Sequence, residues 1–213
     1  MIAGGHTIQD KEPKIGLVAL GFAEEDRLLR KDGLNVGDRL VLTKPLGFGV
    51  TTTALKQQQA PPEDVEEVVS WMKKLNRGAA ALAGQFKLRA STDVTGFSFL
   101  GHAWEMASGA GVGMHISFKD VPFVSCAKKH AAAFRFPGGA SDNMLFYNEY
   151  IKFDAQLLEE HRFLLFDPQT SGGLLLGVPQ KDLDAFMTAA QSADQPAWVV
   201  GEVVPGDRIR VDG

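Results

Sequence analysis

The chain has 213 residues, and its 22 Lys and Arg against 26 Asp and Glu give a formal net charge of −4. This balance disfavours a nucleic-acid-binding protein, because such domains usually carry a basic excess. Apolar residues make up 45% of the sequence, which supplies a folded core and excludes global disorder. No apolar run reaches the roughly 18 residues that a membrane-spanning helix needs. We therefore expect one or two globular domains with neither a nucleic-acid nor a membrane partner.

The cysteine count and the N-terminus indicate the compartment. Cys126 is the single cysteine, which excludes an internal disulfide framework and a zinc site built on several cysteines. We interpret it as an ordinary, partly buried thiol. Residues 1–6 lack the basic and apolar regions of a signal peptide. The expectation is a soluble, cytoplasmic protein.

The N-terminal part of the chain predicts a domain boundary. Residues 15–22 (IGLVALGF) form a short apolar run that predicts a buried strand. The composition changes between Phe22 and Gly37. We expect residues 1–32 to be the end of a first domain and residues 33–213 to form a second domain.

The rest of the chain mixes strand and helix patterns without a strict alternation. A helix over residues 63–83 is indicated by Pro62, by acidic residues at its start and by an apolar face, with Gly78 as a point where it could divide. Strands are expected at 39–43, 88–93, 114–118, 174–178, 198–204 and 209–211, helices at 49–58, 98–108, 125–134 and 181–191, and a loop at 138–143. This order predicts an α+β fold with a mixed, largely antiparallel sheet and helices packed on one face.

Three glycine-containing segments are candidates for the site. The first is Gly4-Gly5-His6-Thr7, where adjacent glycines expose backbone N–H groups and Thr7 adds a hydroxyl. A flexible terminus or a plain turn explains the same residues.

The second segment places Asp93 at the end of an expected strand, followed by Gly96 and a helix. A carboxylate there can bind Mg²⁺, and the start of the helix can hold a phosphate. The alternative is that Asp93 caps the turn and Gly96 shapes it.

The third segment is residues 167–173 (DPQTSGG), which leads into an apolar strand. Its hydroxyls and paired glycines suit a ligand, but they also suit a structural bend. Elsewhere, His102 is interpreted as a packed, hydrogen-bonded side chain and Lys44 as a solvated one.

Together these segments resemble the selenophosphate synthetase (selenide, water dikinase) family, within the superfamily that includes aminoimidazole ribonucleotide synthetase. The Asp167 segment is the most specific of them. The resemblance extends from the first residues to about Val204. It is carried by residues 4–7 (GGHT), 43–47 (TKPLG), 92–97 (TDVTGF), 100–102 (LGH), 137–139 (PGG), 167–175 (DPQTSGGLL) and 201–203 (GEV).

The resemblance implies an ATP-dependent phosphotransferase that makes selenophosphate, AMP and orthophosphate from selenide, ATP and water, with Mg²⁺ as cofactor. It implies that Asp93 binds the metal. The residues that it places against the nucleotide or in the cleft beside it are Gly4, Gly5, Thr7, Asp167, Gln169, Thr170, Ser171, Gly172 and Gly173.

The sequence departs from this family in what it lacks. The family's N-terminal half carries a catalytic Cys or selenocysteine, a Lys and further metal-binding aspartates, and none of these occurs here. We therefore expect no catalytic residue in this chain, an inactive fragment, and a homodimer that is weakened or rebuilt around residues 15–22. Ser98 stands where the family usually has Gly. The alternatives are a related synthetase or kinase of the same superfamily, or a non-catalytic interaction module of a larger fusion protein.

Overall fold

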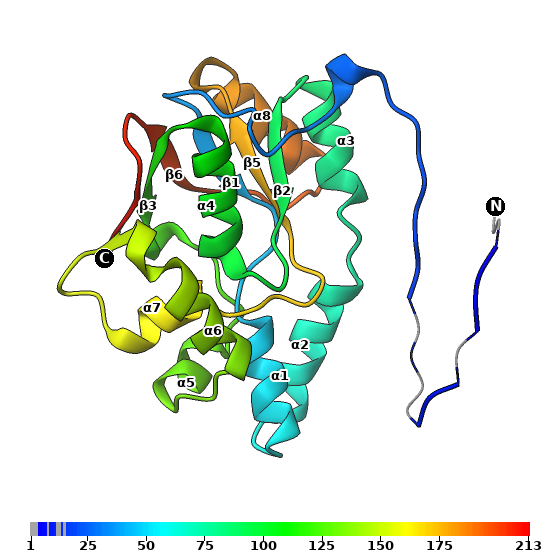
Figure 1. Ribbon diagram of the computed structural model, residues 1–213, viewed down its shortest axis with the longest axis vertical. Coiled ribbons are helices and arrows are strands. Elements are labelled where there is room, and N and C mark those ends of the chain that lie inside the picture. Colours follow the sequence, from blue (N-terminus) through cyan, green and yellow to red (C-terminus); the bar gives the residue numbers. More distant parts are fainter. Residues whose placement is uncertain (1–3, 8, 12–13, 15) are drawn as a thin grey trace.

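The computed structural model describes residues 4–7, 9–11, 14 and 16–213. One sheet with the strand order β2-β5-β1-β6-β3-β7-β4 organises the fold (Figure 1). Its neighbours are antiparallel except at β3–β7 and β7–β4, so the expected mixed, largely antiparallel α+β fold is confirmed. The strands are β1 (Arg39–Leu42), β2 (Ala90–Asp93), β3 (Gly113–Ser117), β4 (Ile151–Phe153), β5 (Leu174–Val178), β6 (Trp198–Val204) and β7 (Ile209–Asp212).

Helices cover both faces of the sheet, where one covered face was expected. Strand β1 shows why, because successive side chains of a strand point to opposite faces. Leu40 and Leu42 join the core cluster that contains α4, whereas Val41 joins the cluster that contains α3 and α8. The helices are α1 (Phe48–Lys56), α2 (Pro62–Lys73), α3 (Arg77–Gln85), α4 (Ser98–Ala110), α5 (Ala127–Ala132), α6 (Gly138–Tyr147), α7 (Glu159–Leu165) and α8 (Leu183–Ser192).

A third apolar cluster lies beyond one end of the sheet, where α1, α2 and α5 gather (Figure 1). Phe48 of α1, Val68 of α2 and Leu164 of α7 are buried together there. Helix α1 starts shortly after β1 ends, so this cluster holds the chain at the edge of the sheet where the candidate site lies.

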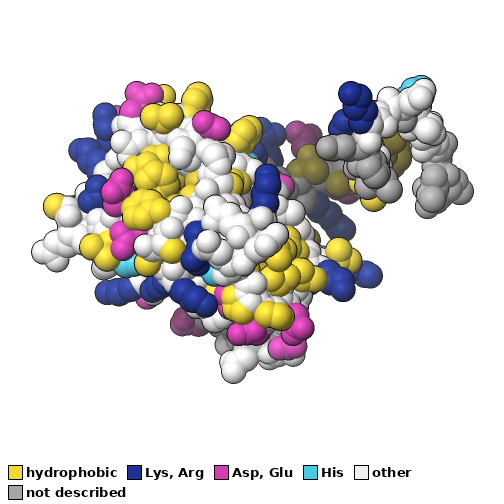
Figure 2. Space-filling view, turned by 90° about the horizontal axis from the view of Figure 1, so that it is seen from below, with side chains coloured by type: hydrophobic (Ala, Val, Ile, Leu, Met, Phe, Trp, Pro, Cys, Tyr) yellow, Lys and Arg dark blue, Asp and Glu magenta, His cyan; other side chains and the backbone are white. Residues whose placement is uncertain are grey.

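The prediction of a buried strand at residues 15–22 is wrong for residues 16–22, which the structure describes. Residues 16–22 belong to no strand, and Ile15 lies outside the described residues. Leu17 is 97% exposed and Phe22 is fully exposed. Figures 1 and 2 show the N-terminal segment standing clear of the body of the protein. A strand needs a hydrogen-bonded neighbour, and this segment has none among the described residues.

Two local expectations also differ from the structure. The sequence predicts a loop at residues 138–143, but these residues begin α6. Pro137 has the extended conformation of a residue that precedes a helix, and Asn143 is held by bonds to distant carbonyl groups that the local sequence does not reveal. The expected helix 63–83 is two helices, and the break falls at residues 74–76 rather than at Gly78. Among the described residues, no helix is both long enough and apolar enough to cross a membrane.

Candidate functional site

Asp93 is the last residue of β2 and faces solvent. Residues 90–92 are buried, whereas Asp93 is exposed. Its side chain makes no hydrogen bond or ion pair with the described residues. An exposed carboxyl group without a hydrogen-bond partner is available to a cation. The alternative reading, in which the Asp93 side chain caps the turn, has no hydrogen bond to support it.

The loop at residues 167–173 lies directly beside Asp93. Strands β2 and β5 pair antiparallel with Asp93 opposite Leu174, and the Val94 N–H donates to the Gly173 carbonyl at 2.8 Å. Two motifs that are about 75 residues apart in the sequence therefore meet at one edge of the sheet. The pairing of β2 with β5 therefore places Asp93 beside this loop.

The two glycines of the loop are needed for close backbone approach. A Cβ on Gly172 would lie 2.0 Å from the Val94 carbonyl oxygen. A Cβ on Gly173 would lie 2.5 Å from the Lys44 backbone nitrogen. The glycine pair lets the loop pass between the ends of β1 and β2. Both glycines are therefore explained by close contacts within the protein.

Asp167 and Gln169 are buried and point away from solvent, toward the start of α1. Gln169 Oε1 accepts from the N–H groups of Gly47 and Phe48, at 3.1 Å each. Asp167 Oδ2 accepts from the Gly49 N–H at 2.9 Å. These side chains satisfy the free N–H groups at the helix start. They hold the loop in place, and their burial leaves no surface for a ligand.

Burial also changes the ionisation of Asp167. It raises the pKa of this carboxyl to about 7, although hydrogen bonds from Gln169 and the Gly49 backbone act in the opposite direction. Asp167 Oδ1 has no hydrogen-bond partner among the described residues. Near neutral pH this group is therefore poised between the charged and the neutral form.

Thr170 and Ser171 are the exposed residues of the loop. Ser171 has a positive φ of 58°, and its hydroxyl donates to the Met72 carbonyl at 2.8 Å. The Ser171 carbonyl accepts from Lys44 Nζ at 2.7 Å. Lys44 is 2% exposed, so the expectation of a solvated lysine is wrong. Burial lowers the pKa of the Lys44 amine, and the nearby positive charge of Lys74 lowers it further.

His102 packs behind the Asp93 turn, as the sequence indicated. It is 5% exposed, and its ring bonds to Thr95 on one side and to Glu105 on the other. Burial alone would raise the pKa of Glu105, but hydrogen bonds from Lys31 and His102 lower it overall. Glu105 is therefore a carboxylate.

Asn143 is a residue that the sequence did not single out. Its side-chain amide donates to the Gly96 carbonyl at 3.0 Å and to the Phe166 carbonyl at 3.2 Å. It joins the turn after Asp93 to the segment before Asp167. Residues 138–143 (GGASDN) have the composition of a loop, which hides the helical position of Asn143.

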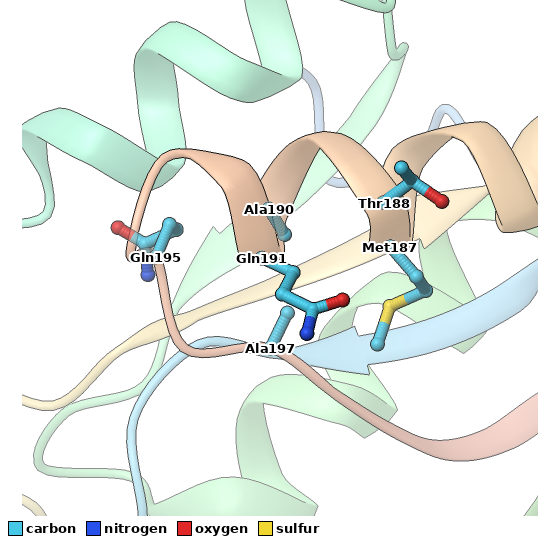
Figure 3. Close-up of a pocket in the computed structure, with 6 residues that line it drawn as sticks. All are labelled: Met187, Thr188, Ala190, Gln191, Gln195 and Ala197. Atoms are coloured by element: carbon cyan, nitrogen blue, oxygen red, sulfur yellow. The ribbon is translucent and has the colours of Figure 1, made fainter.

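Gly4, Gly5 and Thr7 are not brought to this site. They lie in the exposed N-terminal segment, and no atom comes within 4 Å of a Cβ placed on Gly4 or Gly5. The pocket in Figure 3, about 310 Å³, is also elsewhere, between α8 and the segment before β6. It is lined by Met187, Thr188, Ala190, Gln191, Gln195 and Ala197, so it contains none of the candidate residues.

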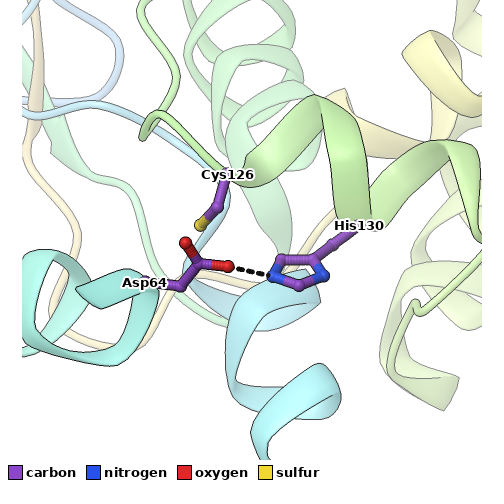
Figure 4. Close-up of side chains that lie close together, drawn as sticks. All are labelled: Asp64, Cys126 and His130. Carbon is purple, nitrogen blue, oxygen red and sulfur yellow. Dashed lines mark hydrogen bonds and ion pairs between the residues drawn. The ribbon is translucent and has the colours of Figure 1, made fainter. Parts of the chain in front are cut away.

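A separate buried cluster joins Asp64, Cys126 and His130 (Figure 4). The sequence does not indicate it, because Asp64 is 66 residues away from His130 along the chain. Arg135 Nη1 donates to His130 Nδ1 at 3.0 Å, so the ring hydrogen is on Nε2 and is donated to Asp64 at 2.8 Å. Both ring nitrogens are thereby occupied. Burial raises the pKa of the Cys126 thiol, and the cluster is a hydrogen-bonded support for α2 and α5.

Comparison with known proteins identifies close relatives. A selenide, water dikinase of Pelobacter propionicus is 44% identical over 215 residues, which cover 100% of this chain and 62% of that protein. Selenide, water dikinase 2 of Peptoclostridium acidaminophilum is 41% identical and covers 96% of this chain and 59% of that protein. The chain thus spans about 60% of the length of these relatives.

Solved structures of more distant proteins share the fold. The hydrogenase maturation protein HypE of E. coli matches with a TM-score of 0.63 at 17% identity, over 87% of this chain and 49% of HypE. Thiamine-monophosphate kinase of Stenotrophomonas maltophilia matches with a TM-score of 0.61 at 18% identity, over 87% of this chain and 53% of that one. The family model for the C-terminal domain of AIR synthase related proteins matches residues 35–213. The chain therefore belongs to the AIR synthase related proteins and contains their C-terminal domain.

Proposed function

We propose that this chain is the C-terminal portion of a selenide, water dikinase, with residues 1–32 as the end of the preceding domain. The whole protein would convert selenide, ATP and water into selenophosphate, AMP and orthophosphate. The observation that carries this proposal is the unpaired, exposed Asp93 carboxylate at the end of β2, next to Val94 whose N–H bonds to the Gly173 carbonyl, in a chain 44% identical to a selenide, water dikinase.

In this proposal Asp93 binds Mg²⁺. The exposed, unpartnered carboxylate fits a hard cation that prefers oxygen ligands. Magnesium would supply neutralisation of the phosphate charges during phosphoryl transfer. The residues of this chain would keep the site in position. Lys44 donates to the Ser171 carbonyl and Asn143 donates to the Gly96 carbonyl, while Gln169 joins the loop to the start of α1.

The exposed residues Thr170 and Ser171 are the members of the loop that we propose to face the nucleotide. Asp167 and Gln169 would hold the loop in place by their bonds to the start of α1. Gly172 and Gly173 would allow the loop backbone to pass close to the neighbouring strands. For Gly4, Gly5 and Thr7 the proposal of nucleotide contact rests on the sequence resemblance. A cytoplasmic location is proposed from the buried, unpaired thiol of Cys126, which suits a reducing compartment.

The test joins this chain to the N-terminal portion of the Pelobacter propionicus relative and measures selenide-dependent selenophosphate formation. We expect an active chimera, because the relative is 44% identical over the joined region. Asp93→Asn should lower kcat/KM at least about 100-fold, since it removes a metal ligand. The 213-residue chain alone should form no selenophosphate.

Asp142→Asn is the matched control, because Asp142 is also an exposed aspartate but lies in α6. It should retain the activity of the unmodified chimera. A folded Asp93→Asn chimera with full activity would contradict the proposed role of Asp93. Transfer of phosphate to another acceptor in preference to selenide would favour the related-kinase alternative.

A further inference from the structure

Lys44 is a buried cation that has no anionic partner among the described residues. It follows the last residue of β1 by two positions and is 2% exposed. Its ammonium group makes one hydrogen bond, to the Ser171 carbonyl at 2.7 Å, although such a group has three hydrogens to donate. Burying a charge without a partner of opposite charge is costly, so a lysine in this position needs a reason.

Lys74 brings a second positive charge to the same place. It is the one charged group that acts on the pKa of Lys44 among the described residues, and it lowers this pKa further than burial alone does. Lys74 directly follows α2, and its Nζ lies 5.5 Å from the centre of the Trp71 ring. An anion held by both lysines would be attracted by each of them and would relieve their mutual repulsion.

The exposed tip of the loop at residues 167–173 separates Lys44 from solvent. Ser171 is exposed, its carbonyl accepts from Lys44, and its hydroxyl donates to the Met72 carbonyl in the last turn of α2. The Lys44 ammonium therefore lies directly beneath an exposed residue. Ser171 also has a φ of 58°, a left-handed conformation that residues other than glycine rarely adopt. Moving this residue relieves strain while it exposes the ammonium.

The sheet places Lys44 at the same edge as Asp93. Strand β5 lies between β2 and β1, and Asp93 ends β2 where Leu174 begins β5 and Leu42 ends β1. Neighbouring strands lie about 4.8 Å apart, so the ends of β2 and β1 are about 10 Å apart. A cation at Asp93 and the ammonium of Lys44 would therefore reach different phosphate groups of one polyphosphate chain.

We propose that Lys44 is an anion-binding residue that, together with Lys74, holds a phosphate group of a nucleotide polyphosphate beside residues 170–171. The choice of a nucleotide phosphate rests on the function proposed above, whereas the anion site itself rests on the contacts of Lys44. In the free protein the ammonium donates to the Ser171 carbonyl, and phosphate oxygens take over this bond when the ligand binds. Lys44 thus binds ligand in addition to holding the loop.

The first experiment titrates the 213-residue chain with pyrophosphate, without metal and at constant ionic strength, and follows its amide signals by NMR. We expect saturable shifts centred on Lys44 and residues 170–173. Orthophosphate, titrated in the same way, should bind more weakly because it carries less charge. Equal or tighter binding of orthophosphate would assign the site to free phosphate and overturn the nucleotide assignment. Shifts that are absent, or centred elsewhere, would overturn the site itself.

Substitutions assign the binding to the two lysines. Lys44→Met should weaken pyrophosphate binding at least about 10-fold, since it removes a charged donor from a shielded position. Lys74→Ala should weaken it about 2- to 5-fold, because Lys74 is partly exposed. Lys56→Ala is the matched control, because Lys56 is an exposed lysine at the end of α1 that is remote from the loop. It should leave the affinity unchanged.

Thermal unfolding distinguishes ligand binding from a purely structural role. Without anion, Lys44→Met should be at least as stable as the wild type, because it removes an unpaired buried charge. Pyrophosphate should raise the melting temperature of the wild type but not that of Lys44→Met. A less stable Lys44→Met that keeps the wild-type affinity would show that Lys44 only holds the loop, and would overturn the proposal.

The remaining outcomes are decided by Lys74 and by the absence of metal. Should Lys44→Met fail to fold, an unchanged affinity of Lys74→Ala would overturn the site, and a weakened one would support it. None of these measurements uses metal or selenide. Their failure would therefore leave the proposed roles of Asp93 and of the whole protein standing, and an inactive chimera would leave the anion site standing.

Discussion

Asp93 and Asp167 are both aspartates of the recognised motifs, but their surroundings give them opposite roles. Asp93 is exposed and unpaired, so its side chain is open to solvent and available to a cation. Asp167 is 0% exposed and lies against the first N–H groups of α1. Transferring a charge into the interior is costly unless it is paired, so burial favours the neutral form of Asp167.

Asp167 makes the stability of the protein depend on pH. Its pKa is raised from 3.8 to about 7, so native Asp167 holds its proton over a range where the unfolded chain has lost it. Asp167 therefore contributes less and less to the free energy of unfolding as the pH rises through this range, by at most about 1.4 kcal/mol per pH unit. Above about pH 7 its contribution becomes constant.

Asp167→Asn should remove this slope. We expect the free energy of unfolding of the wild type, relative to the variant, to decrease between about pH 4 and pH 7. Urea denaturation at several pH values measures it. Asp142→Asn changes an exposed aspartate in the same way and should give a curve parallel to that of the wild type. Parallel curves for Asp167→Asn would show that Asp167 does not titrate in this range.

Helix α1 shows, at the scale of an element, how a distant loop completes a local structure. Its N-terminal flanking residue is Gly47, with φ of 108° and no side chain to cap the helix. The sequence next to α1 therefore leaves the N–H groups of Gly47 and Phe48 without a partner. Gln169, more than 100 residues away, supplies the acceptor. The same bonds fix the loop beside Asp93, so the stability of the helix and the geometry of the site are linked.

Gln169→Ala should destabilise the protein by about 1–3 kcal/mol, because it leaves two buried N–H groups without an acceptor. Chemical denaturation measures the loss. Gln57→Ala is the control, because Gln57 is an exposed residue at the other end of α1. It should change the free energy of unfolding by no more than about 0.5 kcal/mol. A Gln169→Ala variant as stable as this control would show that Gln169 does not cap the helix.

For the whole molecule, the contrast is between a packed body and an N-terminal segment that packs on nothing among the described residues. The sheet is covered on both faces, and a third cluster closes one end. By contrast, Leu17, Val18 and Leu20 are at least 90% exposed. Apolar side chains in extended, unpaired backbone favour association with another chain. We propose that any dimer of this chain is weak and forms through residues 16–22.

Deletion of residues 1–24 tests this proposal. The melting temperature should change by less than about 2 °C, because residues 16–22 contribute no packing to the body. Association, measured by size-exclusion chromatography with light scattering, should decrease. The double substitution Leu17→Ser and Leu20→Ser in the full chain should have the same effect on association. A tight dimer that survives the deletion would contradict the proposal.

The amino-acid sequence by itself determined the strands whose apolar runs are continuous, such as β5 and β6, and it determined the motifs around Asp93 and Asp167. Those signals are local, because a buried strand needs only a short run of apolar residues. The break between α2 and α3, the helix at Gly138–Tyr147 and the three-residue strand β4 were not predicted correctly. Each is decided by contacts with distant elements, which outweigh local preferences.

The tertiary structure alone decided what each motif residue does. Only pairing of β2 with β5 shows that Asp93 lies beside Gly173, and only burial separates Asp167 and Gln169, which hold α1, from the exposed Thr170 and Ser171. The exposed apolar run at residues 16–22 makes the same point, because hydrophobicity can favour a strand but cannot supply its neighbour. A sequence specifies which groups are present, whereas their solvation and partners depend on chain segments far away in the sequence.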